Sequence, residues 1–337
     1  MHKYYVVAPF AASTGGVELA HQLVDCLREL KQCAYIVYVD SKCNIVENGV
    51  VTDFYRNYNI EVSSCIEDSS GNMLILPEIY FDFIFEYNEI NIGCWWMSVD
   101  NRYLRCSFLQ TFNFSKGLIS KLKVIKRFLV GKEEFARNDN NTLKSFGDRI
   151  IHFYQSAYAQ YHLYDQGFSR VLPLSDYINS SFLNNRDERR ENVVLYNPKK
   201  GAAFTNCLIK QMPNLRFIPL IGYNRNELTE LMKCAKLYID FGSFPGKDRL
   251  PREAVLNGCC ILTGKNGASA FYEDVAIPQY YKIETKLKNI SLIESKIRYI
   301  INNFNECQKD MDIYRFRILK EQNLFKNEVK NLVELLK

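Results

Sequence analysis

The chain has 337 residues, 47% of them apolar and 24% charged, and a formal net charge of +5. Its length predicts two domains, and its apolar content excludes a disordered chain. The small net charge does not favour a dedicated nucleic-acid binder, so we expect no nucleic-acid partner.

The cysteines and the N-terminus bear on the cellular compartment. The 11 cysteines form no C-x-x-C pair and mostly lie in apolar runs, which is typical of reduced, buried thiols. Residues 4–8 read as a strand rather than as a cleavable signal sequence. No apolar run approaches the ~20 residues needed to cross a bilayer. We therefore expect a cytoplasmic protein, or one that is peripheral on the cytoplasmic face of the inner membrane.

Short apolar runs alternate with helical periodicity through the first half of the chain. Runs without a polar face are typical of parallel strands that are covered on both sides. Strands are predicted at residues 4–8, 34–39, 73–76, 92–97, 150–155 and 170–174, and a helix at 16–30. This order predicts a doubly wound α/β domain.

A glycine pair, Gly15 and Gly16, follows the first predicted strand. Glycines at a strand-to-helix turn let a ligand approach the backbone, and the first helix amides favour an anionic or polyhydroxyl group. The alternative is a plain tight turn with a Ser or Thr cap. Together with Glu18, these glycines form a candidate ligand loop.

Polar side chains follow the predicted strand at 92–97, namely Ser98, Asp100 and Asn101. Ligands of open α/β sheets bind at the carboxyl ends of the strands, so these residues are candidates for substrate contact. Asp100 is our candidate catalytic residue, as a general base toward an acceptor hydroxyl. Ordinary turn chemistry is the alternative for an Asp-Asn pair after a strand.

Residues 115–132 form a basic segment with six Lys or Arg side chains and no acid. Its apolar residues Leu118, Leu122, Ile125 and Leu129 recur at helical spacing on one face. This pattern predicts a basic amphipathic helix on an anionic membrane surface. The alternative is a surface helix whose apolar face packs on its own domain.

The stretch 184–192 is polar and highly charged, which is typical of a hinge between domains. After it, strands are predicted at 193–196, 215–220, 237–240 and 259–263, and helices at 205–211, 227–234 and 252–257. The tail from 291 onward has a helical pattern. This second βαβ series predicts a second doubly wound domain.

Two lysines, Lys199 and Lys200, lie in the loop after the first strand of the second domain. Cations in a loop that opens a helix favour a diphosphate, because charge and helix dipole act together. The alternative is a solvated lysine pair.

The densest group of charged residues lies between the predicted strand at 237–240 and the next helix. It contains Lys247, Asp248, Arg249 and Glu253. An apolar strand does not need such a loop for folding, so we expect its cations to bind phosphates and a carboxylate to bind ribose hydroxyls. The spacing is not that of a Walker A loop. The four histidines show no metal-ligand spacing, so we expect no metal site and no metal requirement.

Three runs of sequence resemble GT-B glycosyltransferases that are encoded with bacterial capsule and lipopolysaccharide biosynthesis. They are Trp-Trp-Met-Ser-Val-Asp-Asn at 95–101, Leu-Ser-Asp-Tyr-Ile at 174–178, and Phe-Gly-Ser-Phe-Pro-Gly-Lys-Asp-Arg-Leu-Pro-Arg-Glu-Ala at 241–254. The resemblance implies two Rossmann-like domains that face a cleft. The acceptor domain would span 1–185, and the donor domain 192–337 with C-terminal helices.

The resemblance also implies roles for the candidate residues. Glu253 would bind the donor ribose, and Lys200, Lys247 or Arg249 the diphosphate, whereas the Gly15–Gly16 turn would line the acceptor and phosphate side. The implied activity is transfer of a sugar from a nucleotide-sugar donor to a glycan or lipid-linked glycan acceptor, without a bound cofactor or metal.

The sequence departs from the common retaining pattern at one position. That pattern has a further Glu eight residues before Glu253, where this chain has Pro245, so the role of the missing Glu is not carried over. Two alternatives remain open. One is a GT-B-like sugar-nucleotide epimerase or hydrolase, and the other is a non-catalytic module that binds glycan or lipid.

Overall fold

The computed structural model describes residues 2–12, 14–40, 43–47, 49–104, 108–115, 117–130, 139–179 and 190–336. The chain divides into two compact units. Unit 1 comprises Met1–Gln155, Ala159–Asp176 and Leu324–Lys337, and unit 2 comprises Ser156–Tyr158 and Tyr177–Asn323. Most of the predicted hinge at 184–192 lies outside the described residues.

Unit 1 contains a six-stranded parallel sheet in the order β2-β1-β3-β4-β5-β6. Its strands are β1 (Lys3–Pro9), β2 (Cys33–Val39), β3 (Met73–Pro77), β4 (Asn91–Trp96), β5 (Ile150–Tyr154) and β6 (Val171–Pro173). All five residues of β3 are buried. Such strands are apolar throughout because both faces of the sheet are covered, as the sequence pattern predicted.

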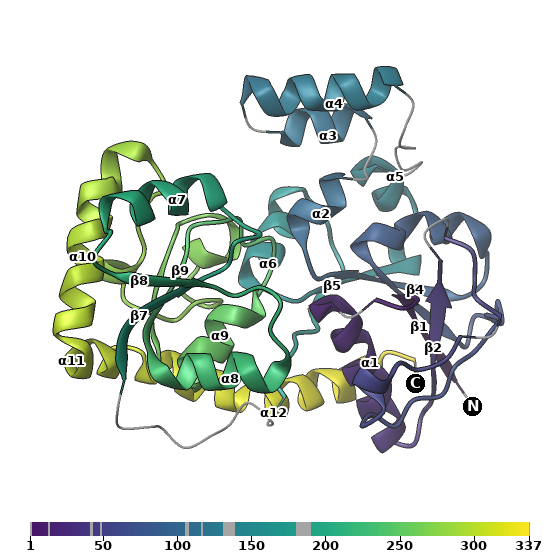
Figure 1. The fold of residues 1–337 in the computed structure, drawn as a ribbon. Helices are drawn as coiled ribbons and strands as arrows, with labels where there is room; N and C mark the ends of the chain where they lie inside the picture. Colours follow the sequence, from purple (N-terminus) through teal and green to yellow (C-terminus); the bar gives the residue numbers. More distant parts are fainter. Residues whose placement is uncertain are drawn as a thin grey trace. The chain divides into compact units, whose positions relative to one another are not determined.

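The helices of unit 1 follow the strands of its sheet (Figure 1). They are α1 (Gly15–Glu29), α2 (Val99–Leu104), α3 (Phe108–Phe114), α4 (Leu118–Val130), α5 (Asn140–Ser145) and α6 (Ala157–Asp165), with 3-10 turns η1 (Asp53–Tyr55), η2 (Glu78–Glu86) and η3 (Gly147–Arg149). Helix α1 packs on β1 and β2, and Leu23, Val24 and Leu27 form its buried side. The predicted helix at 16–30 is therefore confirmed.

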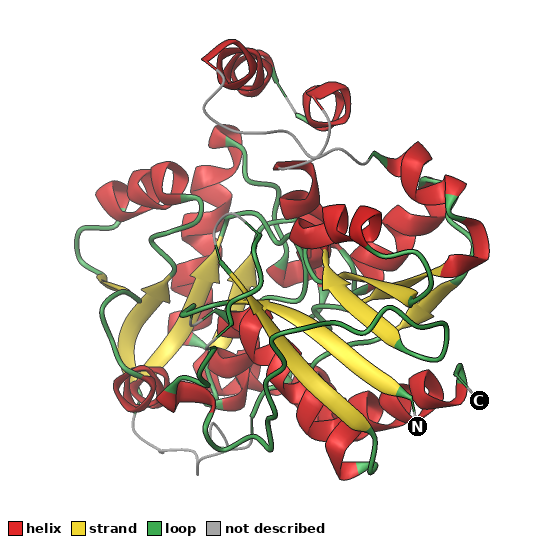
Figure 2. Cartoon of the chain, turned by 90° about the vertical axis from the view of Figure 1, so that its right-hand side faces the viewer, coloured by secondary structure: helices red, strands yellow, loops and turns green. Residues whose placement is uncertain are grey.

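Unit 2 contains a four-stranded parallel sheet in the order β10-β9-β7-β8. Its strands are β7 (Glu191–Tyr196), β8 (Arg216–Pro219), β9 (Ala235–Asp240) and β10 (Cys260–Thr263). Its helices are α7 (Ala202–Gln211), α8 (Arg225–Cys234), α9 (Arg249–Leu256), α10 (Ile290–Asn302) and α11 (Phe304–Lys309), with 3-10 turns η5 (Gly267–Ala270), η6 (Gln279–Tyr281) and η7 (Leu287–Asn289). Figure 1 shows α7 and α8 on opposite faces of this sheet, and helices flank the strands in Figure 2. The doubly wound arrangement predicted for the second half is confirmed.

The last helix, α12 (Asp312–Glu334), starts in unit 2, and its residues from Leu324 onward belong to unit 1. Phe325, Val329 and Leu332 are buried. Glu328 accepts hydrogen bonds from the backbone N–H and the hydroxyl of Ser175, at 2.7 and 2.6 Å. The end of the chain is therefore bound to the segment that follows β6.

Candidate functional site

The candidate donor loops follow two neighbouring strands of unit 2. Strand β7 lies between β8 and β9, so the chain winds outward in opposite directions from the β7–β9 pair. Ligands of doubly wound sheets bind at this switch point, beyond the carboxyl ends of the strands. The loop with Lys199 and Lys200 follows β7, and the loop 241–248 follows β9. The topology thus brings together two segments that sequence analysis singled out separately.

The two loops are in direct backbone contact at Gly201 and Gly242. A Cβ on Gly242 would lie 2.3 Å from the Cβ of Lys200, and Gly201 has a φ of +61° close to the backbone of Phe241 and Gly242. Only glycine fits such an approach without displacing a neighbour. The residue before Gly201 is Lys200, and its ammonium lies 2.5 Å from a carboxylate oxygen of Asp248.

Asp240, the last residue of β9, fixes the start of the second loop. One carboxyl oxygen accepts the backbone N–H of Gly242 at 2.9 Å, and the other accepts the hydroxyl of Tyr238 at 2.9 Å. Burial is the main cause that raises the pKa of Asp240 to about 6. This buried side chain therefore holds the loop and does not face solvent.

A second support comes from the turn after β10. Ala268 donates its N–H to the carbonyl of Phe244 at 2.8 Å, and Asn266 donates to the carbonyl of Gly242 at 3.3 Å. Gly267 has a φ of +58°, and a Cβ there would lie 2.0 Å from the carbonyl oxygen of Phe244. The loop 241–248 is thus held from β9 and from the turn after β10.

Lys247 of the loop 241–248 and Arg252 of α9 pair with one carboxylate of α12. Glu321 lies 2.8 Å from Lys247 and 2.8 Å from Arg252, and the three side chains are 8%, 10% and 0% exposed. Arg252 also donates to the carbonyls of Asp248 and Lys247. The predicted phosphate ligand Lys247 therefore has a buried carboxylate partner and braces the loop against α12.

Arg249 and Glu253 form an i, i+4 pair on the first turns of α9. Their side chains approach to 3.2 Å and are 17% and 7% exposed. Asn257 donates to the backbone carbonyl of Glu253 at 2.8 Å, which ties the end of this helix. Asp248, at the N-cap position of α9, makes no side-chain cap hydrogen bond, since its carboxylate is directed to Lys200.

The Gly15–Gly16 turn of unit 1 also follows a strand at a switch point, because β1 and β3 are neighbours in the sheet. A Cβ on Gly16 would lie 3.5 Å from the sulfur of Met97, so the start of α1 lies beside the end of β4. Gly15 is the first residue of α1. Glu18 is buried and accepts a hydrogen bond from the hydroxyl of Tyr58 at 2.9 Å. Its carboxylate thus anchors α1.

The three polar residues after β4 differ in exposure. Asp100 is partly exposed in the first turn of α2, and Asn101 is exposed. The hydroxyl of Ser98 is buried and has no hydrogen-bond partner among the described residues. Asp100 and Asn101 are thus accessible to a ligand, and the buried hydroxyl of Ser98 is not satisfied by the protein itself.

One carboxyl group at this edge was not singled out from the sequence. Glu78 follows β3 directly, is buried, and accepts the backbone N–H of Met97 at 3.2 Å. Burial raises the pKa of Glu78 to about 7. The available signal was a single acid at the end of an apolar strand, but only the strand order places it beside β4.

The basic segment forms α4, which lies beside α3 (Figure 1). Phe128 of α4 contacts the ring of Phe108 at 4.5 Å, and Val124 is buried. The predicted apolar stripe lies on another face of the helix. Its leucines, Leu118, Leu122 and Leu129, are 75%, 54% and 75% exposed. The alternative, in which this stripe packs on its own domain, is therefore wrong for these three leucines. Residues 116, 131 and 132 of the segment lie outside the described residues.

No helix in the described part of the chain has the length and apolar character needed to span a membrane.

The ten cysteines in the described part of the chain are free thiols. His152, one of the four histidines, is buried and accepts the indole N–H of Trp96 at 3.1 Å.

Comparison with known proteins adds the fold class. No family model matches the sequence, and no curated protein matches it. Among solved structures, HepE from Anabaena in complex with UDP and glucose aligns with a TM-score of 0.62 and 11% identity, over 99% of each chain. Sucrose-phosphate synthase from Thermosynechococcus elongatus aligns with a TM-score of 0.60 and 10% identity, over 99% of this chain and 98% of its own. TarM of S. aureus aligns with a TM-score of 0.54 and 14% identity, over 89% of this chain and 66% of its own.

These structures are GT-B glycosyltransferases, and two of the three likenesses extend over nearly the whole of both chains. The two α/β units with parallel sheets and the C-terminal helix that returns to unit 1 agree with that architecture. The chain therefore has the GT-B fold, as the sequence predicted.

Proposed function

We propose that the chain is a glycosyltransferase that moves a sugar from a nucleotide-sugar donor, bound by unit 2, to a glycan or lipid-linked glycan acceptor. The observation that carries the proposal is the contact between the loops after β7 and β9, which places Lys200 and Asp248 within 2.5 Å at the switch point of the sheet. Neighbours of the same fold include HepE in complex with UDP-glucose, which supports a nucleotide sugar as the donor.

Exposure separates the cations that would bind the diphosphate from those that brace the loop. The side chains of Lys200 and Arg249 are 26% and 17% exposed, whereas those of Lys247 and Arg252 are 10% and 0% exposed. We assign the diphosphate to Lys200 and Arg249, with Lys199 exposed beside them. The phosphates would replace Asp248 and Glu253 as partners, and the freed carboxylate of Glu253 would accept hydrogen bonds from the ribose hydroxyls.

In the proposed reaction, an acceptor oxygen forms a bond to the anomeric carbon while the bond from that carbon to the diphosphate breaks. Asp100 takes the proton of the acceptor hydroxyl as general base. Negative charge grows on the leaving diphosphate, and Lys200 and Arg249 stabilise it. Asn101 and the glycines of the α1 turn are the proposed acceptor contacts. No step needs a metal or a bound cofactor.

A thermal-shift panel of UDP-, GDP-, CMP- and dTDP-sugars tests the donor site. A ligand at ~100 times its dissociation constant should stabilise the protein by about 2.7 kcal/mol, and we expect one member of the panel to do so. Lys200→Met should weaken this ligand by about 10- to 100-fold, because one charge-assisted hydrogen bond contributes about 1.5–3 kcal/mol. Lys210→Met, an exposed lysine at the end of α7, is the matched control.

The outcomes of this panel separate the alternatives. No shift with any nucleotide sugar would contradict the proposed function and favour a non-catalytic module. Binding followed by hydrolysis or epimerisation of the donor, with no acceptor present, would favour the sugar-nucleotide epimerase or hydrolase.

We further propose that the acceptor belongs to a bacterial surface polysaccharide and that the enzyme works at the cytoplasmic face of the inner membrane. The resemblance of runs 95–101 and 241–254 to capsule and lipopolysaccharide enzymes supports the acceptor class. The exposed stripe of α4 supports the membrane surface. Lys121, Lys123, Lys126 and Arg127 accompany the stripe, and residues 117–130 contain no acid. Apolar contact and attraction to anionic headgroups would act together there.

Vesicle co-sedimentation tests the membrane contact. The wild-type protein should bind vesicles of phosphatidylcholine with 30% phosphatidylglycerol, and the triple variant Leu118→Ser, Leu122→Ser, Leu129→Ser should bind at least about tenfold more weakly, because each leucine loses apolar burial. A triple variant of exposed leucines in unit 2, Leu287→Ser, Leu292→Ser, Leu319→Ser, is the matched control and should bind like wild type. Equal binding by both triple variants would contradict the contact.

A further inference from the structure

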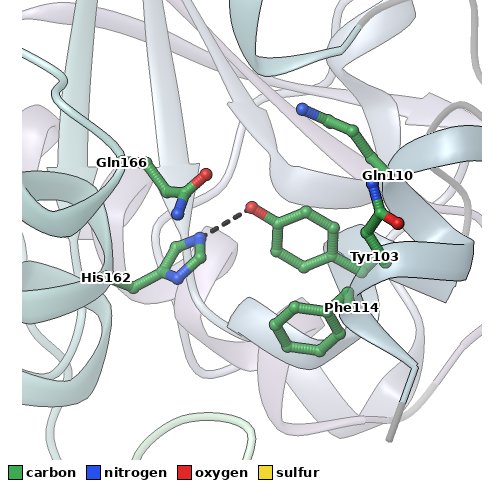
Figure 3. A pocket seen from close by; sticks show the side chains of 6 residues that line it. Tyr103, Gln110, Phe114, His162 and Gln166 are labelled. Atoms are coloured by element: carbon green, nitrogen blue, oxygen red, sulfur yellow. Dashed lines mark hydrogen bonds between the residues drawn. The ribbon is translucent and has the colours of Figure 1, made fainter.

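A pocket of about 310 Å³ lies within unit 1, among helices α2, α3 and α6 (Figure 3). It is lined by Tyr103, Gln110, Asn113, Phe114, His162 and Gln166. Tyr103 comes from α2, the next three from α3, and the last two from α6 and the turn that follows it. Its volume lies in the range of small-molecule sites, roughly 300–1,000 Å³.

Hydrogen bonds fix the polar side of the pocket before any ligand binds. The side-chain amide of the buried Asn140 donates to the Tyr103 hydroxyl at 2.9 Å and to the Gln166 carbonyl at 3.0 Å. Its backbone N–H donates to Gln110 at 3.1 Å. The Tyr103 hydroxyl also lies 2.7 Å from His162 Nε2, as Figure 3 shows. A ligand would therefore meet side chains that are already oriented, which lowers the entropy cost of binding.

The pocket is aromatic on one side, and the described residues that line it carry no formal charge. The rings of Tyr103 and Phe114 stack with their centroids 4.1 Å apart. Burial lowers the pKa of His162 to about 4, so the imidazole is neutral at physiological pH, and its Nε2 shares a hydrogen bond with the Tyr103 hydroxyl. The other four lining residues are three amides and a phenylalanine. Neither an anion such as phosphate nor a cation finds a countercharge among them.

These properties match one class of small molecule. Amide groups both donate and accept hydrogen bonds, as sugar hydroxyls do. Aromatic rings offer an apolar face to the C–H side of a pyranose. We propose that this pocket binds one neutral sugar ring, and that, given the proposed function, the ring belongs to the acceptor.

Helices α3 and α4 pack against each other as a helical hairpin. The position of the pocket on this hairpin supports an acceptor with a lipid attached. Helix α3 supplies three of the lining residues and contacts α4 through the rings of Phe108 and Phe128. Helix α4 carries the exposed leucine stripe. The hairpin thus presents the sugar pocket on one helix and the proposed lipid-facing stripe on the other.

Saturation-transfer NMR on the full chain, without any nucleotide, tests the pocket. The probes are glucose, galactose and N-acetylglucosamine, and we expect transfer to the ring protons of at least one. Asn113→Trp should raise the apparent dissociation constant of that sugar at least tenfold, because the larger side chain occupies the pocket. Asn113 makes no hydrogen bond to any described residue, so this change breaks none of the network.

The matched control is Asn141→Trp, an exposed amide one residue from Asn140 that does not line the pocket. It should bind the sugar like wild type. Phe114→Leu, which keeps the apolar volume but removes the ring, should weaken binding as well. Glucose 6-phosphate should bind no tighter than glucose, because none of the described lining residues is a cation.

Two results would overturn the pocket assignment: no transfer to any of the three sugars, or the same dissociation constant in Asn113→Trp as in wild type. The thermal-shift panel of nucleotide sugars tests the proposed donor site in unit 2, and its result is independent of this measurement. A chain that binds sugar here but no nucleotide would confirm the pocket, and would contradict the proposed function and with it the acceptor role of the sugar.

Discussion

Replacing Glu253 by alanine is expected to lower kcat/KM for the nucleotide sugar by about 100-fold or more. In the proposed complex its carboxylate accepts two ribose hydroxyls, and each hydrogen bond to a charged group contributes about 1.5–3 kcal/mol. The fold should survive, because Arg252 and Glu321 still hold α9, and Ala254, Val255 and Leu256 remain buried. Steady-state kinetics and circular dichroism on the purified variant measure both effects.

Two further variants sharpen this test. Glu253→Gln keeps one acceptor oxygen and should lose less activity than the alanine variant. Glu294→Ala removes another i, i+4 pair with an arginine, Arg298, on α10, outside the donor loops, and should keep wild-type turnover. Wild-type turnover in Glu253→Ala would show that this carboxylate does not bind the donor.

The fold was predictable because its strands are apolar on both faces. Strand β3 is a short run between polar segments, and its five buried residues leave no polar face to suggest another structure. Helices α2 and α3 were harder to predict, since they are only six and seven residues long. A helical pattern of apolar residues can be distinguished from a loop only when it extends over several turns.

The charged loop 241–248 was predictable as a candidate site from its local density of charge, but the partners of its charged side chains were not. Glu321 lies 69 residues from Arg252 along the chain, in a tail whose sequence shows only helical periodicity. As long as the contact with Glu321 is unknown, Lys247 and Arg249 are equivalent candidates for phosphate binding. The structure separates them by partner, since Lys247 pairs with Glu321 of α12 and Arg249 with Glu253 of its own helix. The roles of Lys200, Arg249 and Glu253 in donor binding stay predictions.

The acceptor side shows the limit of sequence patterns more clearly. Glu18 was assigned to the ligand loop because it follows two glycines, yet its carboxylate is buried against Tyr58, which is 40 residues away. Glu78 was missed because nothing in the sequence states that β3 lies between β1 and β4. In α4 the periodicity identified the helix and its apolar stripe. The face of α4 that packs is the one with Val124 and Phe128. Contact with α3 determines that face, and periodicity alone does not show it.

Glu321→Gln is expected to have the largest effect on stability, a loss of about 3–5 kcal/mol, because it removes the charge of a carboxylate that two buried cations share. Arg252 is fully buried and Lys247 is nine-tenths buried, so water cannot replace the lost charge. The loss should concentrate in α9 and the β9–α9 loop. Hydrogen exchange of these amides, followed by mass spectrometry, measures it as an increase in exchange rate of about 100-fold or more.

The chain offers internal controls for the location of this effect. Both tryptophans, Trp95 and Trp96, lie on β4 of unit 1, so their fluorescence reports that unit and should change little in the folded variant. Glu29→Gln removes the partner of Lys326, which lies on the same helix, and both side chains of this pair are exposed, so the change should cost no more than about 1 kcal/mol. A loss of the same size in both variants would mean that α12 responds as a whole. A selective loss in Glu321→Gln would show that one buried carboxylate of the C-terminal helix holds the loop on which the proposed donor site is built.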